Sequence, residues 1–288
     1  MMKHLFKGKL GNSKRNLIKA GQINREQLHK KLMEYYNKNK KYYENMLLSA
    51  PFESYRMYMD YLKPESGKKV LDVGCGVGTV VHHLSEQGFE AYGIDVSPIA
   101  IEIARKSGSG TFKVYDGKKF PFPNNYFDSA GCKDTLEHTV YPEHLLDEMI
   151  RVVKPGGKIV ISCPNFFRVI GFYEHHPLMS GLRNRLLNFF LLAEKYIAYR
   201  LSKKEKIEFM FIDPILDESP APDKDAVFAT NPIDIIFYLK YKDGEIIYYS
   251  GNNNYCKNKL LNEISDFPII KSFTGSFFIV AKKVKNYD

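Results

Sequence analysis

The sequence has few cysteines, and their spacing excludes several classes of protein. The four cysteines, Cys75, Cys132, Cys163 and Cys256, are scattered over 288 residues and make no C-x-x-C pair. Zinc sites and disulfide-rich folds depend on such pairs or clusters. We therefore predict reduced thiols in the core of a cytoplasmic protein.

Long hydrophobic runs are also missing. The most apolar helical stretch, residues 186–193, is much shorter than the ~20 residues that a membrane-spanning helix needs. The first residues show no signal-peptide pattern. We expect no transmembrane segment, and peripheral contact with a membrane surface stays open.

Acidic residues are scarce near the N-terminus. Residues 1–45 contain twelve Lys or Arg and three Asp or Glu, whereas the rest of the chain has thirty of each, so the net charge of +9 belongs to this segment. A basic arm can bind nucleic acid or an anionic membrane. A solvated helix face explains the same pattern, and we favour this interpretation.

Residues 68–95 form the most informative segment. Val70, Leu71 and Val73 form a short apolar run with a β-branched bias, as in a buried parallel strand. Residues 79–87 place apolar side chains on one helical face, and Gly88 suits a helix C-terminus. A second strand, residues 89–94, ends at Asp95, where a carboxylate can bind both hydroxyls of a ribose. The segment predicts a nucleoside-binding unit.

The glycines of this segment discriminate between cofactors. Gly74, Gly76 and Gly78 let the backbone approach a ligand closely, and their spacing is G-x-G-x-G. The dinucleotide pattern needs its third glycine one position later, where Thr79 stands. The spacing therefore disfavours a nicotinamide dinucleotide.

A second signal follows in residues 120–138. Residues 120–128 read Phe-Pro-Phe-Pro-Asn-Asn-Tyr-Phe-Asp, and their prolines and asparagines predict a loop. A strand at residues 127–132 and the run Leu136-Glu137-His138 come next. A tight turn at residues 154–157 and a strand at residues 158–163 complete this part.

These motifs, in this order, resemble the class I S-adenosylmethionine-dependent methyltransferases, and most closely the type 11 and type 23 groups. The resemblance implies an α/β, Rossmann-like fold with a mostly parallel seven-stranded sheet and helices on both faces. It also implies S-adenosylmethionine as cofactor. The expected organisation is a basic N-terminal helical arm at residues 1–65, a cofactor-binding core at 66–165, an inserted cap at 166–226 and a C-terminal completion of the sheet at 227–288.

The resemblance implies roles for individual residues. The glycine loop and Asp72 face the methionine half of the cofactor, Asp95 binds the ribose, Asp116 lies near the adenine amino group and Val96 lies against the ring. The candidate cofactor-binding residues are Asp72, Gly74, Cys75, Gly76, Gly78, Asp95, Val96, Asp116, Gly117 and Lys133. Asp116 has a simpler interpretation as a turn-forming residue before Gly117.

Outside the core, the pattern predicts further elements. A helix begins after Asn24, which can cap it. A tyrosine-rich helix at residues 54–62 either covers the cofactor or packs ordinarily. In the cap we expect a helix at residues 182–201, and then a helix at 232–241 and strands at 245–249 and 277–280. Residues 1–22 show no period.

His138 and Glu137 are the first candidates for catalysis, because a hydroxyl or amine acceptor must lose a proton. In ubiquinone-pathway O-methyltransferases a similar run binds a divalent ion, and Asp134, Glu137 and His138 match its spacing, with Asp134 where those enzymes have Glu. Such a set suits Mg²⁺ or Mn²⁺. A metal site, a general base at His138 and a structural role stay open.

The predicted cap offers weaker candidates. His175 and His176 can reach an acceptor from it, although paired surface histidines are common. Asp223 and Asp225 can face the acceptor too, and a charged loop is the simpler explanation.

The predicted function is methyl transfer from S-adenosylmethionine to a small-molecule acceptor, on oxygen or nitrogen rather than carbon. Three alternatives remain: an RNA methyltransferase that uses the basic arm, a nicotinamide-dependent oxidoreductase, and a cofactor-binding protein without catalysis.

Overall fold

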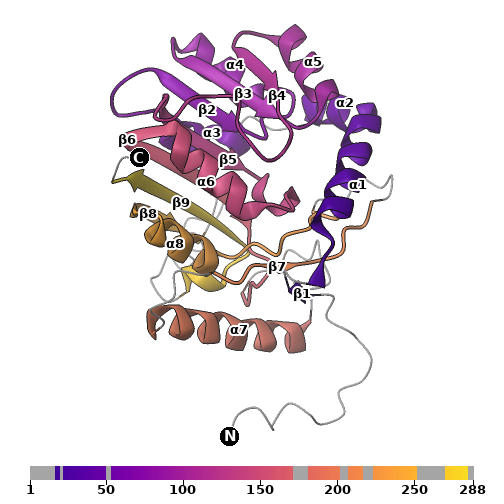
Figure 1. Ribbon diagram of the computed structural model, residues 1–288, viewed down its shortest axis with the longest axis vertical. Helices are drawn as coiled ribbons and strands as arrows, with labels where there is room; N and C mark the ends of the chain where they lie inside the picture. Colours follow the sequence, from indigo (N-terminus) through magenta and orange to yellow (C-terminus); the bar gives the residue numbers. More distant parts are fainter. Residues whose placement is uncertain are drawn as a thin grey trace, which may run out of the picture.

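The computed structural model describes residues 17–19, 22–49, 53–170, 181–201, 207–216, 223–251 and 270–284. These residues form a seven-stranded sheet covered by helices on both faces, and a separate two-stranded sheet (Figure 1). The main-sheet strands are β2 (Lys69–Val73), β3 (Glu90–Asp95), β4 (Thr111–Val114), β5 (Phe127–Lys133), β6 (Val153–Pro164), β8 (Gly244–Ser250) and β9 (Ser276–Lys283).

The strand order is β4-β3-β2-β5-β6-β9-β8. The first five strands of this order run parallel, and β9 is antiparallel to both of its neighbours. The predicted mostly parallel, Rossmann-like sheet is therefore confirmed.

The helices begin where the sequence supplies capping residues. Asn24 accepts a hydrogen bond from the Gln27 N–H at 3.1 Å, and Ser97 accepts one from the Ala100 N–H at 3.3 Å. Each such bond satisfies an N–H group that the first helical turn leaves without a partner. The helices are α1 (Arg25–Lys38), α2 (Lys40–Ser49), α3 (Glu53–Leu62), α4 (Thr79–Glu86), α5 (Pro98–Ser107), η3 (Leu136–His138), α6 (Pro142–Val152), α7 (Leu182–Leu201), α8 (Pro232–Tyr241) and η5 (Lys271–Phe273).

The core lies on both faces of the sheet because side chains alternate along each strand. Leu71 and Val73 face the layer that contains α6 and α8, which lie in front of the sheet in Figure 1. Val70 faces the layer that contains α3, α4 and α5. Both faces of the central strands are thus apolar, as expected for a parallel sheet between two helical layers.

Two local expectations need correction. The tight turn expected at residues 154–157 lies inside β6 as a bulge, since Phe127 of β5 pairs with Val153 and Ser129 pairs with Lys158. Residues 18–19, in a segment without sequence period, form β1 (Ile18–Lys19) and pair with β7 (Met210–Phe211). The partner of β1 lies far along the chain, so no local pattern could reveal it.

The segment after β6 is attached to the body through α7. The Lys195 ammonium lies 2.9 and 3.0 Å from the two carboxylate oxygens of Asp234 on α8, and the Tyr199 hydroxyl donates to the same carboxylate at 2.9 Å. Figure 1 shows α7 at the opposite end of the molecule from α4 and α5. The described part of this segment therefore packs on α8, and only residues 215, 216 and 223–225 of it border the cavity described below.

No helix within the described ranges combines the length and the hydropathy needed to cross a membrane. Cys75, Cys132 and Cys163 are buried thiols, as expected for core positions, and Cys256 lies outside the described residues.

The cap of α8 gives a first testable prediction. Asn231 is fully buried, accepts from the Asp234 N–H at 2.9 Å and donates to the Asp234 carboxylate at 2.8 Å. We expect Asn231→Ala to lower the free energy of unfolding by about 2 kcal/mol, the upper end for loss of a cap. Urea unfolding would measure this, with Asn24→Ala at the exposed cap of α1 as the matched control. Equal losses in both variants would contradict the role of burial.

Candidate cofactor and acceptor site

The conformation of the glycine loop between β2 and α4 requires glycine at positions 74 and 76. Gly74 and Gly76 have φ values of 71° and 51°, in the left-handed region. A Cβ on Gly74 would lie 2.2 Å from the Thr135 side chain, and one on Gly76 would lie 2.9 Å from the sulfur of Met46. The loop backbone is thus packed between α2 and the end of β5 with no room for side chains.

Asp95 lies at the end of β3 and is hydrogen-bonded to this loop. Its carboxylate accepts hydrogen bonds from the Gly76 N–H at 3.0 Å and the Ser97 N–H at 2.9 Å. Burial raises the pKa of Asp95, and the two N–H groups lower it. The carboxylate is therefore held at the carboxyl edge of the sheet, where open α/β sheets bind ligands.

Asp72 lies on β2 beneath the loop. It is buried, and the Tyr58 hydroxyl on α3 donates to it at 2.7 Å. Burial raises the pKa of Asp72 to about 7, and the Tyr58 hydrogen bond offsets only part of this rise. The site therefore holds an acid whose charge depends on pH near neutrality.

A cavity of about 1300 Å³ opens at this edge of the sheet. Its walls come from the glycine loop, from α1 and α2, from the residues after β5 and from residues 215, 216 and 223–225. Among the residues that line it are Asp72, Gly74, Cys75, Gly76, Asp95, Val96, Gly117, Lys133, Asp134, His138, Asp223 and Asp225. Because ligand pockets usually measure roughly 300–1,000 Å³, this cavity has room for two molecules.

One end of the cavity is formed by the residues after β3 and β4. Val96 and Gly117 line it, and a Cβ on Gly117 would lie 2.7 Å from the His29 ring of α1. Asp116 is exposed, and its carboxylate accepts from the N–H groups of Lys118 at 2.9 Å and Lys119 at 2.8 Å. These bonds match the turn-forming interpretation of Asp116, and its contact with adenine stays a prediction.

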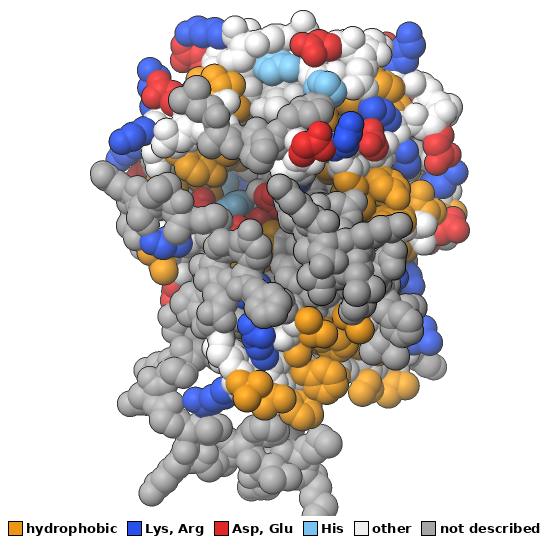
Figure 2. Space-filling view, turned by 180° about the vertical axis from the view of Figure 1, so that it is seen from behind, with side chains coloured by type: hydrophobic (Ala, Val, Ile, Leu, Met, Phe, Trp, Pro, Cys, Tyr) orange, Lys and Arg blue, Asp and Glu red, His pale blue; other side chains and the backbone are white. Residues whose placement is uncertain are grey.

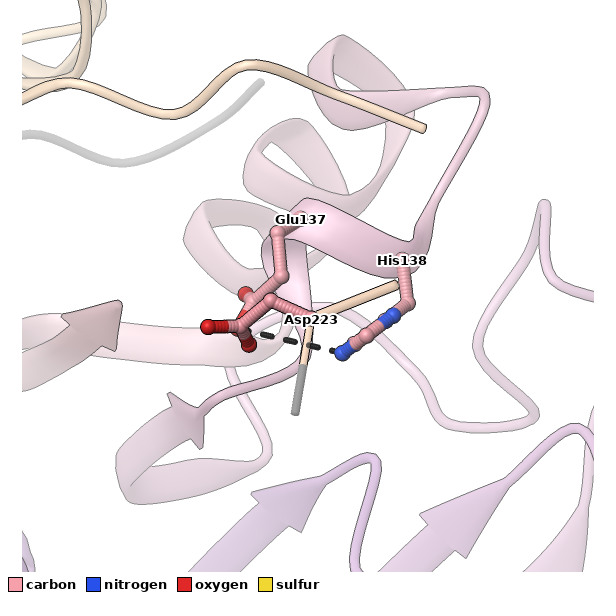
Figure 3. A group of neighbouring side chains, drawn as sticks. All are labelled: Glu137, His138 and Asp223. Atoms are coloured by element: carbon pink, nitrogen blue, oxygen red, sulfur yellow. Dashed lines mark ion pairs between the residues drawn. The ribbon is translucent and has the colours of Figure 1, made fainter. Parts of the chain in front are cut away.

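A group of acidic and histidine side chains borders the same cavity through His138 and Asp223. Glu137, His138 and Asp223 each place a ligand-type atom within 4.8 Å of the others (Figure 3). Glu137 is completely buried, and neither of its carboxylate oxygens has a hydrogen-bond partner within the described part of the chain. Its nearest charged neighbour is the His138 ring, at 3.9 Å. A buried charge without hydrogen bonds is costly, so this geometry favours an additional bound cation or proton.

Asp225 and Tyr36 extend this group. The Asp225 carboxylate lies 3.4 Å from Nδ1 of His138 and accepts from the Tyr36 hydroxyl at 2.8 Å. Burial raises the pKa of Glu137 to about 8. Burial alone would lower the pKa of His138, but Asp225 and Glu137 outweigh it and raise that pKa to about 9. His138 is therefore protonated at neutral pH when nothing else neutralises the carboxylates.

Residues 71–161 match a family model described as a methyltransferase domain. Residues 71–161 of this chain therefore form a methyltransferase domain. The matched residues run from β2 into β6, so they include the glycine loop, Asp95 and the run from Leu136 to His138. This family implies S-adenosylmethionine as the cofactor.

Two curated relatives share the methyltransferase domain. The mitochondrial ubiquinone biosynthesis O-methyltransferase of Schizosaccharomyces pombe is 35% identical over 107 residues, which cover 34% of this chain and 38% of that protein. The demethylmenaquinone methyltransferase of Paenarthrobacter aurescens is 30% identical over 148 residues, 51% of this chain and 54% of that one. The chain thus spans about half or less of the length of these relatives.

A solved structure resembles the whole fold. It is described as a complex between the Trm112 methyltransferase activator of Haloferax volcanii and a methyltransferase. The TM-score is 0.54 with 14% identity, and the match covers 89% of this chain and 99% of that chain. At this level of identity the similarity concerns the fold alone.

The methyltransferase domain brings most predicted cofactor residues together. The exceptions are Asp116, which does not line the cavity, and Gly78, which begins α4 beside it with a φ of 87°. Cys75 lines the cavity, but its N–H is bonded to the Ile94 carbonyl at 3.0 Å. Whether the assembled residues bind the cofactor stays a prediction.

The predicted metal ligands are only partly brought together. Glu137 and His138 are adjacent, but Asp134, with a φ of 49°, directs its carboxylate to the Lys133 ammonium. Asp223 from the segment before α8 takes the third place in the group. His175 and His176 lie outside the described residues, so their roles stay predictions.

Some residues of the site were not among the sequence candidates. Tyr58, whose hydroxyl donates to Asp72, belongs to the tyrosine-rich helix, for which two interpretations were open. Neither Tyr36 nor Thr135 could be identified as a site residue from the sequence, because the residues around them do not indicate what these side chains contact. The backbone N–H groups of Val227 and Phe228 donate to the Glu137 carbonyl at 2.8 and 2.9 Å, which explains how a distant segment comes to lie beside η3.

The raised pKa of Asp72 predicts pH-dependent cofactor binding. The family resemblance places Asp72 against the methionine half, where its carboxylate can bind the amino group. Below pH 7 this acid is protonated in the empty site, so affinity for S-adenosylmethionine should fall by up to about tenfold per pH unit between pH 7 and 5.5. Titration calorimetry would measure the slope. Asp72→Asn should bind more weakly at pH 7.5 and show no slope, and an equal slope in both proteins would contradict the assignment.

Proposed function

We propose that this protein transfers a methyl group from S-adenosylmethionine to a hydroxyl or amine of a small-molecule acceptor. One observation carries the proposal: a single cavity is lined by Asp95 and the glycine loop and also by His138 and Asp223. A cofactor bound along the loop and an acceptor bound near His138 would therefore share one space. The two curated relatives, which are named as a ubiquinone biosynthesis O-methyltransferase and a demethylmenaquinone methyltransferase, support a small acceptor.

The residues present fit the cofactor. Gly74 and Gly76 leave backbone where a Cβ would collide with neighbouring side chains, and the buried Asp95 carboxylate stands at the edge of the cavity. When bound, S-adenosylmethionine supplies a methyl group already activated by its sulfonium. The protein then has to position the acceptor and exclude water, and it needs no nucleophile of its own.

The second chemical requirement is removal of the proton from the acceptor group. We propose that Glu137, His138 and Asp223 hold a divalent cation such as Mn²⁺ or Mg²⁺, which would lower the pKa of an acceptor hydroxyl. The buried, unbonded carboxylate oxygens of Glu137 support this assignment over that of a base at His138 alone. Without a cation, the nearby Asp225 and Glu137 carboxylates raise the pKa of His138 and disfavour it as a base, and a bound cation would replace that proton on the ring.

The wall opposite the glycine loop belongs to the predicted cap. We propose that Ile215, Leu216 and residues 223–225, which line the cavity, contact the acceptor. Two of these side chains are apolar, two are acidic and one, Lys224, is basic. Such a wall fits an acceptor with an apolar body and a polar reactive group.

The test combines cofactor binding with turnover. Calorimetry should show binding of S-adenosylmethionine and no binding of NADH. Formation of S-adenosylhomocysteine should then appear with members of a panel of phenols, catechols and amines, in the presence of Mn²⁺ or Mg²⁺. NADH binding without S-adenosylmethionine binding would support an oxidoreductase. Cofactor binding without turnover on any member would support a non-catalytic role, and turnover with RNA only would identify an RNA methyltransferase.

A further inference from the structure

Helix α7 turns a continuous apolar strip toward solvent. Its exposed hydrophobic side chains recur at spacings of three, four and seven residues, which places them on one side of the helix. They are exposed by 41% to 79%, and they are Leu182, Leu186, Phe189, Phe190, Tyr196, Ile197 and Leu201. Isolated surface leucines are ordinary, but a strip of this length on one helix marks an interaction site.

Most of this strip does not hold α7 in place, although Phe189 contacts the Phe273 ring at 5.3 Å and Tyr196 contacts the Phe237 ring of α8 at 5.9 Å. The buried side of the helix carries Asn188, Leu192, Lys195 and Tyr199. Asn188 donates to the Arg168 carbonyl at 3.1 Å, and Lys195 pairs with Asp234. The helix is thus fixed mainly by its other side, and Leu182, Leu186, Phe190, Ile197 and Leu201 remain more than half exposed. Figure 2, which shows the back of the molecule, has hydrophobic side chains gathered toward the end where α7 lies in Figure 1.

The charged residues of α7 indicate which kind of partner the apolar strip binds. Apart from the buried Lys195, the helix carries the three arginines Arg183, Arg185 and Arg200 and one acidic residue, Glu194. Arg183 and Arg200 are exposed near its two ends. The next five residues, 202–206, add three lysines and one glutamate in the sequence. A helix with aromatic and aliphatic residues on one side and cations beside them is typical of helices that lie in the interface of an anionic bilayer.

The shape of the strip agrees with a lipid surface. A helix of 20 residues is about 30 Å long, and α7 lies along an edge of the molecule (Figure 1). It therefore presents a long ridge. A ridge can sink into a deformable headgroup layer, whereas a protein partner would have to provide a matching groove.

We propose that α7 docks this protein on an anionic phospholipid surface. The helix lies in the plane of the membrane, with the apolar strip at the level of the upper acyl chains and with Arg183 and Arg200 on lipid phosphates. The inference concerns a surface separate from the cofactor cavity, since no residue of α7 lines that cavity.

Vesicle co-sedimentation of the full chain tests the proposal. The protein should bind vesicles that contain phosphatidylglycerol at least tenfold more strongly than vesicles of phosphatidylcholine alone, and added salt should weaken this binding. The double substitution of Phe190→Ser and Ile197→Ser should lower binding at least tenfold. Ile247→Ser on β8, which removes a hydrophobic side chain that is 44% exposed elsewhere on the surface, should leave binding unchanged.

The charge contribution is tested separately. Replacing Arg183 and Arg200 with glutamate should reduce binding to the anionic vesicles at least tenfold, with unchanged thermal stability and S-adenosylmethionine affinity as controls for folding. A wild-type protein that stays in solution with both kinds of vesicle would overturn the proposal. So would a dimer, detected by light scattering, that Phe190→Ser and Ile197→Ser dissociate while vesicle binding is absent, because a second copy would then cover the strip.

Discussion

Replacing Asp95 with alanine should lower the affinity for S-adenosylmethionine by about 100-fold. If the carboxylate binds both ribose hydroxyls, the variant loses two hydrogen bonds to a charged group, each worth about 1.5–3 kcal/mol. A total near 3 kcal/mol corresponds to roughly two orders of magnitude in the dissociation constant. The variant also removes the acceptor of the Gly76 and Ser97 N–H groups, which adds to the loss by loosening the loop. Titration calorimetry at pH 7.5 would measure the change.

Two variants separate binding from folding. Asp95→Asn keeps the shape of the side chain and should bind with intermediate affinity. Asp60→Ala removes an exposed carboxylate that pairs only locally with Lys63, so it should leave the affinity unchanged. If Asp95→Ala keeps wild-type affinity, no ribose is bound at the end of β3. The assignment of the cavity as the cofactor site would then be wrong.

The fold was predictable because its signals are local. Gly88 ends a helix with a φ of 87°, and Ser97 begins the next one by capping it, and both features are visible within a few residues of sequence. Val70, Leu71 and Val73 place apolar side chains on both faces of one short run, which indicates a strand between two helical layers. The glycine loop and Asp95 could also be predicted as parts of one site, because β2, α4 and β3 follow one another directly in the sequence.

The acid and histidine group was only partly predictable because its members come from distant parts of the chain. Glu137 and His138 were visible as neighbours in one run. The contact of Tyr36 with Asp225 joins residues 189 positions apart, and only the folded chain places Asp225 beside His138. The spacing that suggested Asp134 carries no information about the backbone, and a φ of 49° directs that side chain toward Lys133 instead.

The proposed cation should be essential for turnover and should depend on Asp223 more than on Asp134. Dialysis against EDTA is expected to lower turnover at least 100-fold without changing the affinity for S-adenosylmethionine, and Mn²⁺ should restore it. This follows because the cation would neutralise the buried Glu137 carboxylate and lower the pKa of the acceptor hydroxyl. Full activity in EDTA would contradict the metal assignment.

Direct measurement of Mn²⁺ binding distinguishes the two possible ligand sets without any need for a known acceptor. Electron paramagnetic resonance follows the loss of the free-ion signal as Mn²⁺ binds. Asp223→Asn removes a carboxylate from the group of atoms that lie within 4.8 Å of one another, so it should weaken Mn²⁺ binding at least tenfold. Asp134→Asn alters a carboxylate that is paired with Lys133, and the affinity should stay within about twofold, because a charge outside the ligand set is screened by that pairing. If Asp134→Asn abolishes binding and Asp223→Asn does not, the ion is held by the run from Asp134 to His138, and the segment before α8 has no part in the chemistry.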